Sequence, residues 1–173
     1  MTKSFLFSVL TIICAAIVES AILSNIYILP VVPDIVLLCS VYFSLLNGRT
    51  YGELSGFASG LTLDFITGVP FGFNCIFRTI VGYVYGLFSE HIIISGILIP
   101  ILSVSTATVL KHLLIWIISF FYANTINPTN LLSVDFLFEL CVNSLLAPFI
   151  FKFLGYFNKT LAIHADKGLP QNA

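Results

Sequence analysis

A glycine-rich stretch inside the chain runs from Gly56 to Gly72 and reads GFASGLTLDFITGVPFG. The chain around it is apolar, yet the stretch carries one aspartate, and its glycines recur at four-residue steps instead of clustering as they do in a loop. Residues four apart lie along one face of an α-helix. Here the series is Gly52, Gly56, Gly60, Asp64 and Gly68. It predicts a helix over 51–67 whose glycine face lets another helix backbone approach closely, either within the chain or on a partner protein.

The composition assigns the chain to a broad class. Of its 173 residues, 58% are hydrophobic and only 9% are charged. A soluble domain carries about 25% charged residues, so this chain could not cover its surface in water. We therefore expect an all-α integral membrane protein. The formal net charge of −1 gives no basic surface for nucleic acid.

The apolar runs predict six membrane-spanning helices in a single domain over 1–173, because one span needs about 20 apolar residues. Pro100 either kinks the fifth helix or marks where its spanning part starts. The expected helices lie at about 5–28, 33–47, 51–67, 71–89, 93–122 and 134–157, and a polar tail follows at 158–173.

The basic residues near the segment ends predict the orientation. If the N-terminus is cytoplasmic, the inner side holds Lys3, Arg49, Lys159 and Lys167, and the outer loops hold no lysine or arginine. Cytoplasmic loops are enriched in these two residues. We therefore expect a multi-pass protein with both termini in the cytoplasm.

Several ionisable residues fall inside the apolar segments, where a charge needs a partner or a wet cavity. Five of them are expected to form one group. Their depth along the expected helices places them in the outer half of the bilayer, as a buried charge cluster of Glu19, Asp64, Arg78, Lys111 and Glu139. The economical pairs are Arg78 with Asp64 or Glu19, and Lys111 with Glu139. Such pairs either lock helices together or line an outward-facing cavity or docking site.

Two further acidic residues, Asp34 and Asp135, lie near expected helix starts, where the helix dipole favours a negative charge. The four cysteines each stand alone in an apolar run and are expected to be small buried hydrophobes, at Cys14, Cys39, Cys75 and Cys141. The sequence shows no catalytic, cofactor-binding or metal-binding constellation.

Three stretches occur in a recognisable order: VVPDIVLL at 31–38, NGRTYGELSGFASGLTLDFITGVPFGFN at 47–74, and FRTIVGYVYG at 77–86. Together they resemble the MreD family of rod shape-determining membrane proteins. The positions that carry the resemblance are Pro33, Asp34, Gly56, Gly60, Asp64, Pro70, Gly72 and Arg78.

The resemblance implies a non-enzymatic scaffold without cofactors in the bacterial inner membrane. Its partner would be an MreC-like bitopic protein and, through it, an MreB-like filament, RodA and the elongation penicillin-binding protein. The family is also similar to the six-helix substrate-binding subunits of energy-coupling-factor transporters. Two alternatives stay open: a subunit that binds a small, vitamin-like solute in the charge cluster, and a binder of lipid-linked precursors in which Arg78 and Lys111 meet phosphate.

Overall fold

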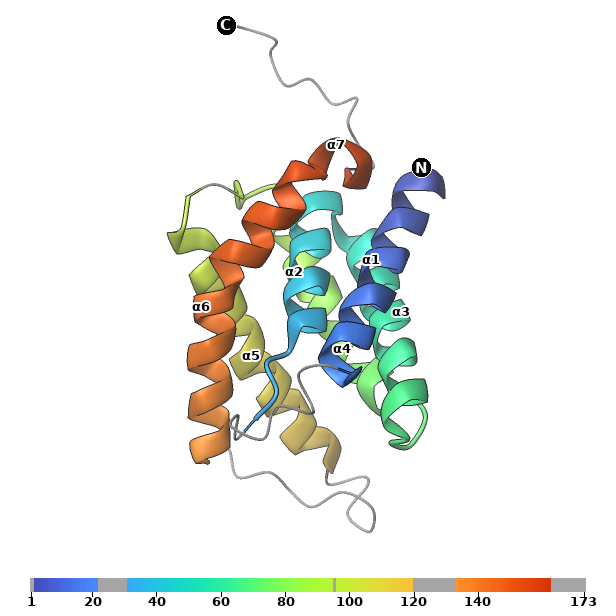
Figure 1. Cartoon of the computed structure of the whole chain (residues 1–173), viewed down its shortest axis with the longest axis vertical. Coiled ribbons are helices and arrows are strands. Elements are labelled where there is room, and N and C mark those ends of the chain that lie inside the picture. Colours follow the sequence, from blue (N-terminus) through green and yellow to red (C-terminus); the bar gives the residue numbers. More distant parts are fainter. Residues whose placement is uncertain (1, 22–30, 95, 120–132, 163–173) are drawn as a thin grey trace, which may run out of the picture.

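The computed structural model describes residues 2–21, 31–94, 96–119 and 133–162, and the regular structure within these ranges is entirely helical (Figure 1). Helices α1 to α6 are close to the expected segments, and α7 is a single turn. Their bounds are α1 Thr2–Ala21, α2 Ile35–Asn47, α3 Arg49–Thr67, α4 Phe73–Leu87, α5 Leu98–Ser119, α6 Val134–Tyr156 and α7 Asn158–Leu161.

The fifth helix begins later than expected. It starts at Leu98 and not at residue 93, and Gly96 lies just before it with a φ of 70°. Pro100 therefore stands in the first turn of α5, where the absence of its N–H breaks no helical hydrogen bond. Residues 22–28 and 120–122, which the sequence places in the first and fifth helices, lie outside the described residues.

Three described helices are long and apolar enough to cross a membrane: α1 over Ser4–Ala21, α5 and α6. Helices α2 and α4 are shorter, with 13 and 15 residues. Helix α3 has 19 residues but is less apolar, because it carries Arg49, Glu53 and Asp64. The chain is thus a helical membrane protein with three clear candidate spans.

Helix α2 is the centre of the bundle. It packs against α1, α3, α4, α5 and α6, and 11 of its 13 residues are buried. Its sequence, IVLLCSVYFSLLN, is apolar on every side, which is the pattern of a helix surrounded by others. The ring of Tyr42 meets the ring of Phe151 of α6 edge-on, with centroids 5.2 Å apart.

The expectation of four buried cysteines is wrong for two of them. Cys39 and Cys75 are buried, whereas Cys14 and Cys141 are exposed. The exposed pair lies on α1 and α6, two of the helices that can cross the membrane, and the bilayer itself is an apolar surrounding for such faces.

Candidate functional site

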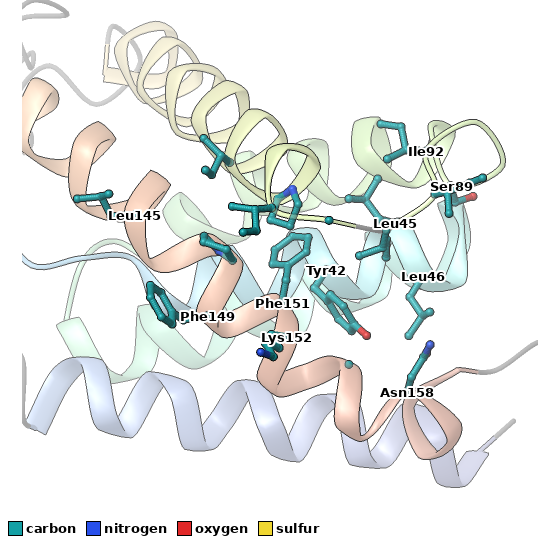
Figure 2. A pocket seen from close by; sticks show the side chains of 18 residues that line it. Tyr42, Leu45, Leu46, Ser89, Ile92, Leu145, Phe149, Phe151, Lys152 and Asn158 are labelled. Atoms are coloured by element: carbon teal, nitrogen blue, oxygen red, sulfur yellow. The ribbon is translucent and has the colours of Figure 1, made fainter.

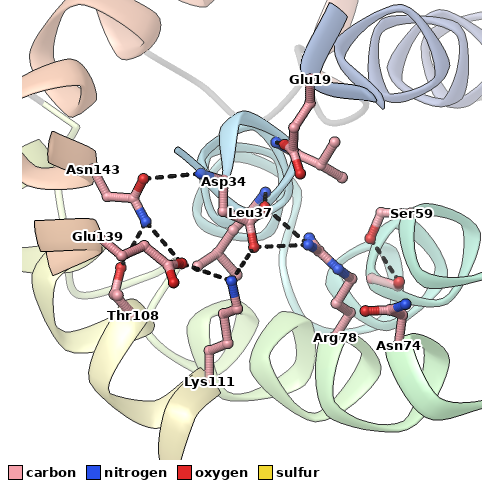
Figure 3. Close-up of polar contacts among 12 residues, drawn as sticks. Glu19, Asp34, Leu37, Ser59, Asn74, Arg78, Thr108, Lys111, Glu139 and Asn143 are labelled. Carbon is pink, nitrogen blue, oxygen red and sulfur yellow. Dashed lines mark hydrogen bonds and ion pairs between the residues drawn. The ribbon is translucent and has the colours of Figure 1, made fainter. Parts of the chain in front are cut away.

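Asp34 is the hub of a buried charge network (Figure 3). Its side chain caps α2 by accepting the backbone N–H of Leu37 at 2.7 Å. The same carboxylate accepts Arg78 Nη2 at 2.8 Å on each oxygen and Lys111 Nζ at 2.7 Å on Oδ2. Asp34 is only 2% exposed. Beyond the expected role at a helix start, this one side chain ties α4 and α5 to the beginning of α2.

Lys111 connects this hub to α6. Its Nζ lies 2.6 Å from Glu139 Oε1, so the expected pair of Lys111 and Glu139 is present. The other oxygen of Glu139 is 3.0 Å from Nε2 of His112, the residue next to Lys111 on α5. The His112 ring also meets Phe136 edge-on at a centroid distance of 4.8 Å. The network therefore continues from α2 through α5 to α6.

Asn143 completes the network, and sequence reasoning missed it because its side chain carries no charge. Its Oδ1 accepts the backbone N–H of Asp34 at 3.0 Å, and its Nδ2 donates to Glu139 Oε1 and to Thr108 Oγ1 at 3.3 Å. Asn143 is fully buried. The available signal was its spacing, because a residue four positions after Glu139 lies on the same helix face.

The expected pair of Arg78 with Asp64 is wrong. Asp64 is 1% exposed, and its carboxylate accepts the backbone N–H groups of Gly72 and Asn74 at 2.9 and 3.0 Å and the Asn74 amide at 2.9 Å. The first amides of a helix have no partner within the helix and carry partial positive charge. Asp64, near the end of α3, therefore holds the turn that leads into α4.

The alternative partner, Glu19, is not hydrogen-bonded to Arg78 either. Its Oε2 accepts the backbone N–H of Val36 at 3.0 Å, in the first turn of α2. Nε and Nη1 of Arg78 are buried without a hydrogen-bond partner among the described residues. Glu19 and Asp34 thus share the start of α2, and Arg78 is bound to Asp34.

The glycine face of α3 packs against α4 of the same chain. A Cβ atom would overlap the carbonyl oxygen of Gly82 if added at Gly52, and that of Arg78 if added at Gly56. At Gly60 it would lie 2.5 Å from the Cα atom of Cys75. The two backbones can touch only because these positions lack side chains. This close contact brings the backbone of Arg78 against α3, from where its side chain reaches Asp34.

Gly68 does not belong to the packing face. It ends α3 with a φ of 67°, and a Cβ atom there would meet nothing within 4 Å. The four-residue spacing continues beyond the end of the helix, where it no longer defines a face. Gly68 is a turn residue, as are Pro70, whose carbonyl accepts the N–H of Phe73 at 3.1 Å, and Gly72, with a φ of 93°.

The network links helices to one another. Its carboxylates and cations point at one another, and none of the charged residues in it borders the large groove described below. Within the described ranges, no three His, Cys, Asp or Glu side chains gather into a possible metal site. What this arrangement does is hold α2, α4, α5 and α6 in one geometry.

A family model for rod shape-determining protein MreD matches residues 1–157. The chain belongs to the MreD family. Membership places it among membrane proteins that determine rod shape, which are not a known enzyme family, and it agrees with the three apolar helices. Neither the curated proteins nor the solved structures give a match to this MreD-family chain.

Proposed function

We propose that the protein is a non-enzymatic scaffold of the bacterial cell-elongation complex in the inner membrane, where it binds an MreC-like bitopic partner and helps to organise lateral peptidoglycan synthesis. The observation that carries this proposal is that the buried charges form ion pairs with one another within the chain. The ion pairs of Asp34, Lys111 and Glu139 connect different helices. A rigid bundle of this kind suits a docking platform better than a reaction site.

The same observation weighs against the alternative of a small-solute subunit. A solute pocket built on the charge cluster needs groups that are free to bind the solute. Lys111 is held between Asp34 and Glu139 at 2.7 and 2.6 Å, and Arg78 is 2% exposed. A phosphate on a lipid-linked precursor would have to displace the same carboxylates. The fold of the energy-coupling-factor subunits stays an expectation from the family resemblance.

The partner would dock away from the glycine face, because α4 fills it. Exposed apolar side chains offer other faces: Leu10 on α1, Phe57 on α3 and Leu145 on α6 are 55%, 50% and 68% exposed. A single-span partner helix can bind only to a surface that the chain leaves free.

We further propose that all six helices from α1 to α6 cross the membrane and that both termini are cytoplasmic. The N-terminus and α7 lie at the same end of the bundle in Figure 1. Asn47, at the end of α2, donates to the carbonyl of Leu161 at that end, with 3.2 Å between Nδ2 and the oxygen. Labelling of single cysteines at positions 125 and 171, both outside the described residues, would test the orientation in a chain without its native cysteines. Labelling of position 125 only from the cytoplasm would contradict it.

Site-specific photo-crosslinking tests the scaffold function. A photoreactive amino acid would replace Leu10, Phe57 or Leu145, one on each exposed face, and Gly56 would be avoided because α4 covers it. We expect one face to capture a bitopic cell-wall protein in rod-shaped cells. Capture from no face, together with co-purification of an ATPase pair, would favour the transporter alternative.

A further inference from the structure

A large groove opens on the side of the bundle (Figure 2). Its volume is about 1290 Å³. It lies between the second half of α2, the first turns of α5 and the second half of α6, and Ser89, Ile92–Ile94, Gly96 and Ile97 also border it. Pockets for small molecules usually measure about 300–1,000 Å³. The groove is therefore large enough for a bulky, elongated ligand.

The wall of the groove is mostly apolar and continues onto a face that is open to the surroundings. Leu145 and Phe149 of α6, which border it, are 68% and 72% exposed. In a chain that crosses a membrane, such a face meets lipid or another helix and is not left empty. The occupant must therefore present an apolar surface to these side chains.

The groove also has polar lining residues. Lys152 lies four residues before the end of α6, Asn158 begins α7, and Ser89 follows the end of α4. The end of α6, with Lys152, leads into α7, and α7 lies at the end of the bundle that carries the N-terminus (Figure 1). Lys152 is exposed and makes no ion pair with any described residue. An amphiphile with a negative head and an apolar body matches this distribution.

We propose that the groove binds an anionic phospholipid, with its phosphate on Lys152 and an acyl chain along the apolar wall. The assignment to the cytoplasmic leaflet rests on the proposed orientation. Basic groups in pockets between membrane helices on the cytoplasmic side are a known way to hold anionic head groups. Lysine near a helix end reaches the head-group region with its ammonium while its stem stays along apolar surface.

Two substitutions test the contact with the lipid head group and the contact with the acyl chain separately. Lys152→Gln removes the charge and leaves the groove in place. Gly155→Phe fills the groove, because Gly155 borders it and a Cβ atom added there meets nothing within 4 Å. The matched controls are Lys3→Gln, on a helix that contributes no residue to the groove, and Gly155→Ala, which adds only a methyl group.

Native mass spectrometry of the full chain, released from nanodiscs of phosphatidylglycerol and phosphatidylcholine, measures the bound lipid. We expect the wild-type protein and Lys3→Gln to retain phosphatidylglycerol in preference to phosphatidylcholine. In Lys152→Gln the ratio of the two bound lipids should fall about five-fold, which corresponds to the contribution of one lysine at an anionic membrane surface. Gly155→Phe would lose bound lipid of both kinds, and Gly155→Ala would keep it. Thermal unfolding in detergent would confirm that all four variants are folded.

Two results would overturn the proposal. One is an unchanged ratio of phosphatidylglycerol to phosphatidylcholine in folded Lys152→Gln. The other is release of a second copy of the chain by Gly155→Phe without any change in bound lipid. Because neither readout depends on the cell-elongation partner, the lipid site can fail while the proposed scaffold function stands.

Discussion

Nη2 of Arg78 lies 2.8 Å from both carboxylate oxygens of Asp34, a residue 44 positions earlier in the chain. Both side chains are 2–3% exposed, so water contributes little to the stabilisation of either charge. Lys111 approaches the same carboxylate at 2.7 Å. The start of α2, the first half of α4 and the second half of α5 therefore depend on one another through a single aspartate.

A double-mutant cycle on this pair is the first prediction. Asp34→Asn and Arg78→Gln each leave a buried group without its partner, and we expect each to lower the free energy of unfolding by about 3–5 kcal/mol. The double variant loses less than the sum, because no isolated charge of the pair remains. Unfolding by SDS titration from mixed micelles would give the three values.

The control for that cycle pairs Arg78→Gln with Asp64→Asn. Asp64 bonds the turn before α4 and makes no hydrogen bond to Arg78. The two losses of stability are then expected to add within about 0.5 kcal/mol. A large coupling between Asp64 and Arg78, with none between Asp34 and Arg78, would contradict an ion pair of Arg78 with Asp34.

The charges show how far sequence reasoning reached. The depth of each residue along its expected segment placed Arg78, Lys111 and Glu139 in one half of the bundle. Lys111 and Glu139 were predicted to pair because they have opposite charges at similar depth. The partner of Arg78 was missed because Asp34 has an ordinary explanation as a helix cap. Depth along a helix does not reveal which way a side chain points, and that direction decides between Asp34 and Asp64.

The glycines show a second limit of the same kind. Four-residue spacing predicted a close packing face at Gly52, Gly56 and Gly60, but spacing carries no information about the helix that fills it. The signal lay in α4, where Gly82 and Gly86 repeat the step of four. A Cβ atom at Gly86 would lie 2.6 Å from Cα of Arg49, so the contact is reciprocal.

The second prediction concerns Asp64 as the anchor of the turn between α3 and α4. Asp64→Ala leaves the partly buried backbone amides of Gly72 and Asn74 without an acceptor. We expect a loss of about 1–3 kcal/mol in the free energy of unfolding. Asn74→Ala removes only the side-chain bond and is expected to cost less. Equal stability of Asp64→Ala and the wild type would show that the carboxylate does not hold this turn.

The third prediction is that removing the charge of Glu139 lowers the free energy of unfolding less than removing the charge of Asp34. In Glu139→Gln, Lys111 loses one carboxylate but keeps Asp34 at 2.7 Å. We expect a loss of about 1.5–3 kcal/mol, the range for a hydrogen bond to a charged group, and therefore less than for Asp34→Asn. Asp135→Asn, an exposed change one turn earlier on α6, serves as the control and is expected to cost less than about 1 kcal/mol. A larger loss of stability for Glu139→Gln than for Asp34→Asn in the same titration would show that Glu139, and not Asp34, is the centre of the network.

The last prediction separates packing from docking on the glycine face. Gly56→Ala puts a methyl group into the carbonyl of Arg78, and Gly60→Ala puts one against the backbone of Cys75. Neither backbone can move aside as a flexible side chain could, so we expect losses of at least about 1–3 kcal/mol, and loss of folded protein for Gly56→Leu.

Gly155→Ala is the matched control for the glycine variants, because a Cβ atom there meets open space. The exchange removes a helix-weakening glycine and is expected to be neutral or stabilising by up to about 1 kcal/mol. Folded yield and partner capture would be measured together for all four variants. Because α4 covers the glycine face, Gly56→Ala protein that still folds is expected to capture its partner normally. Normal folded yield with lost capture would instead identify the glycine face as the partner's docking site, and α4 would then have to leave it when the partner binds.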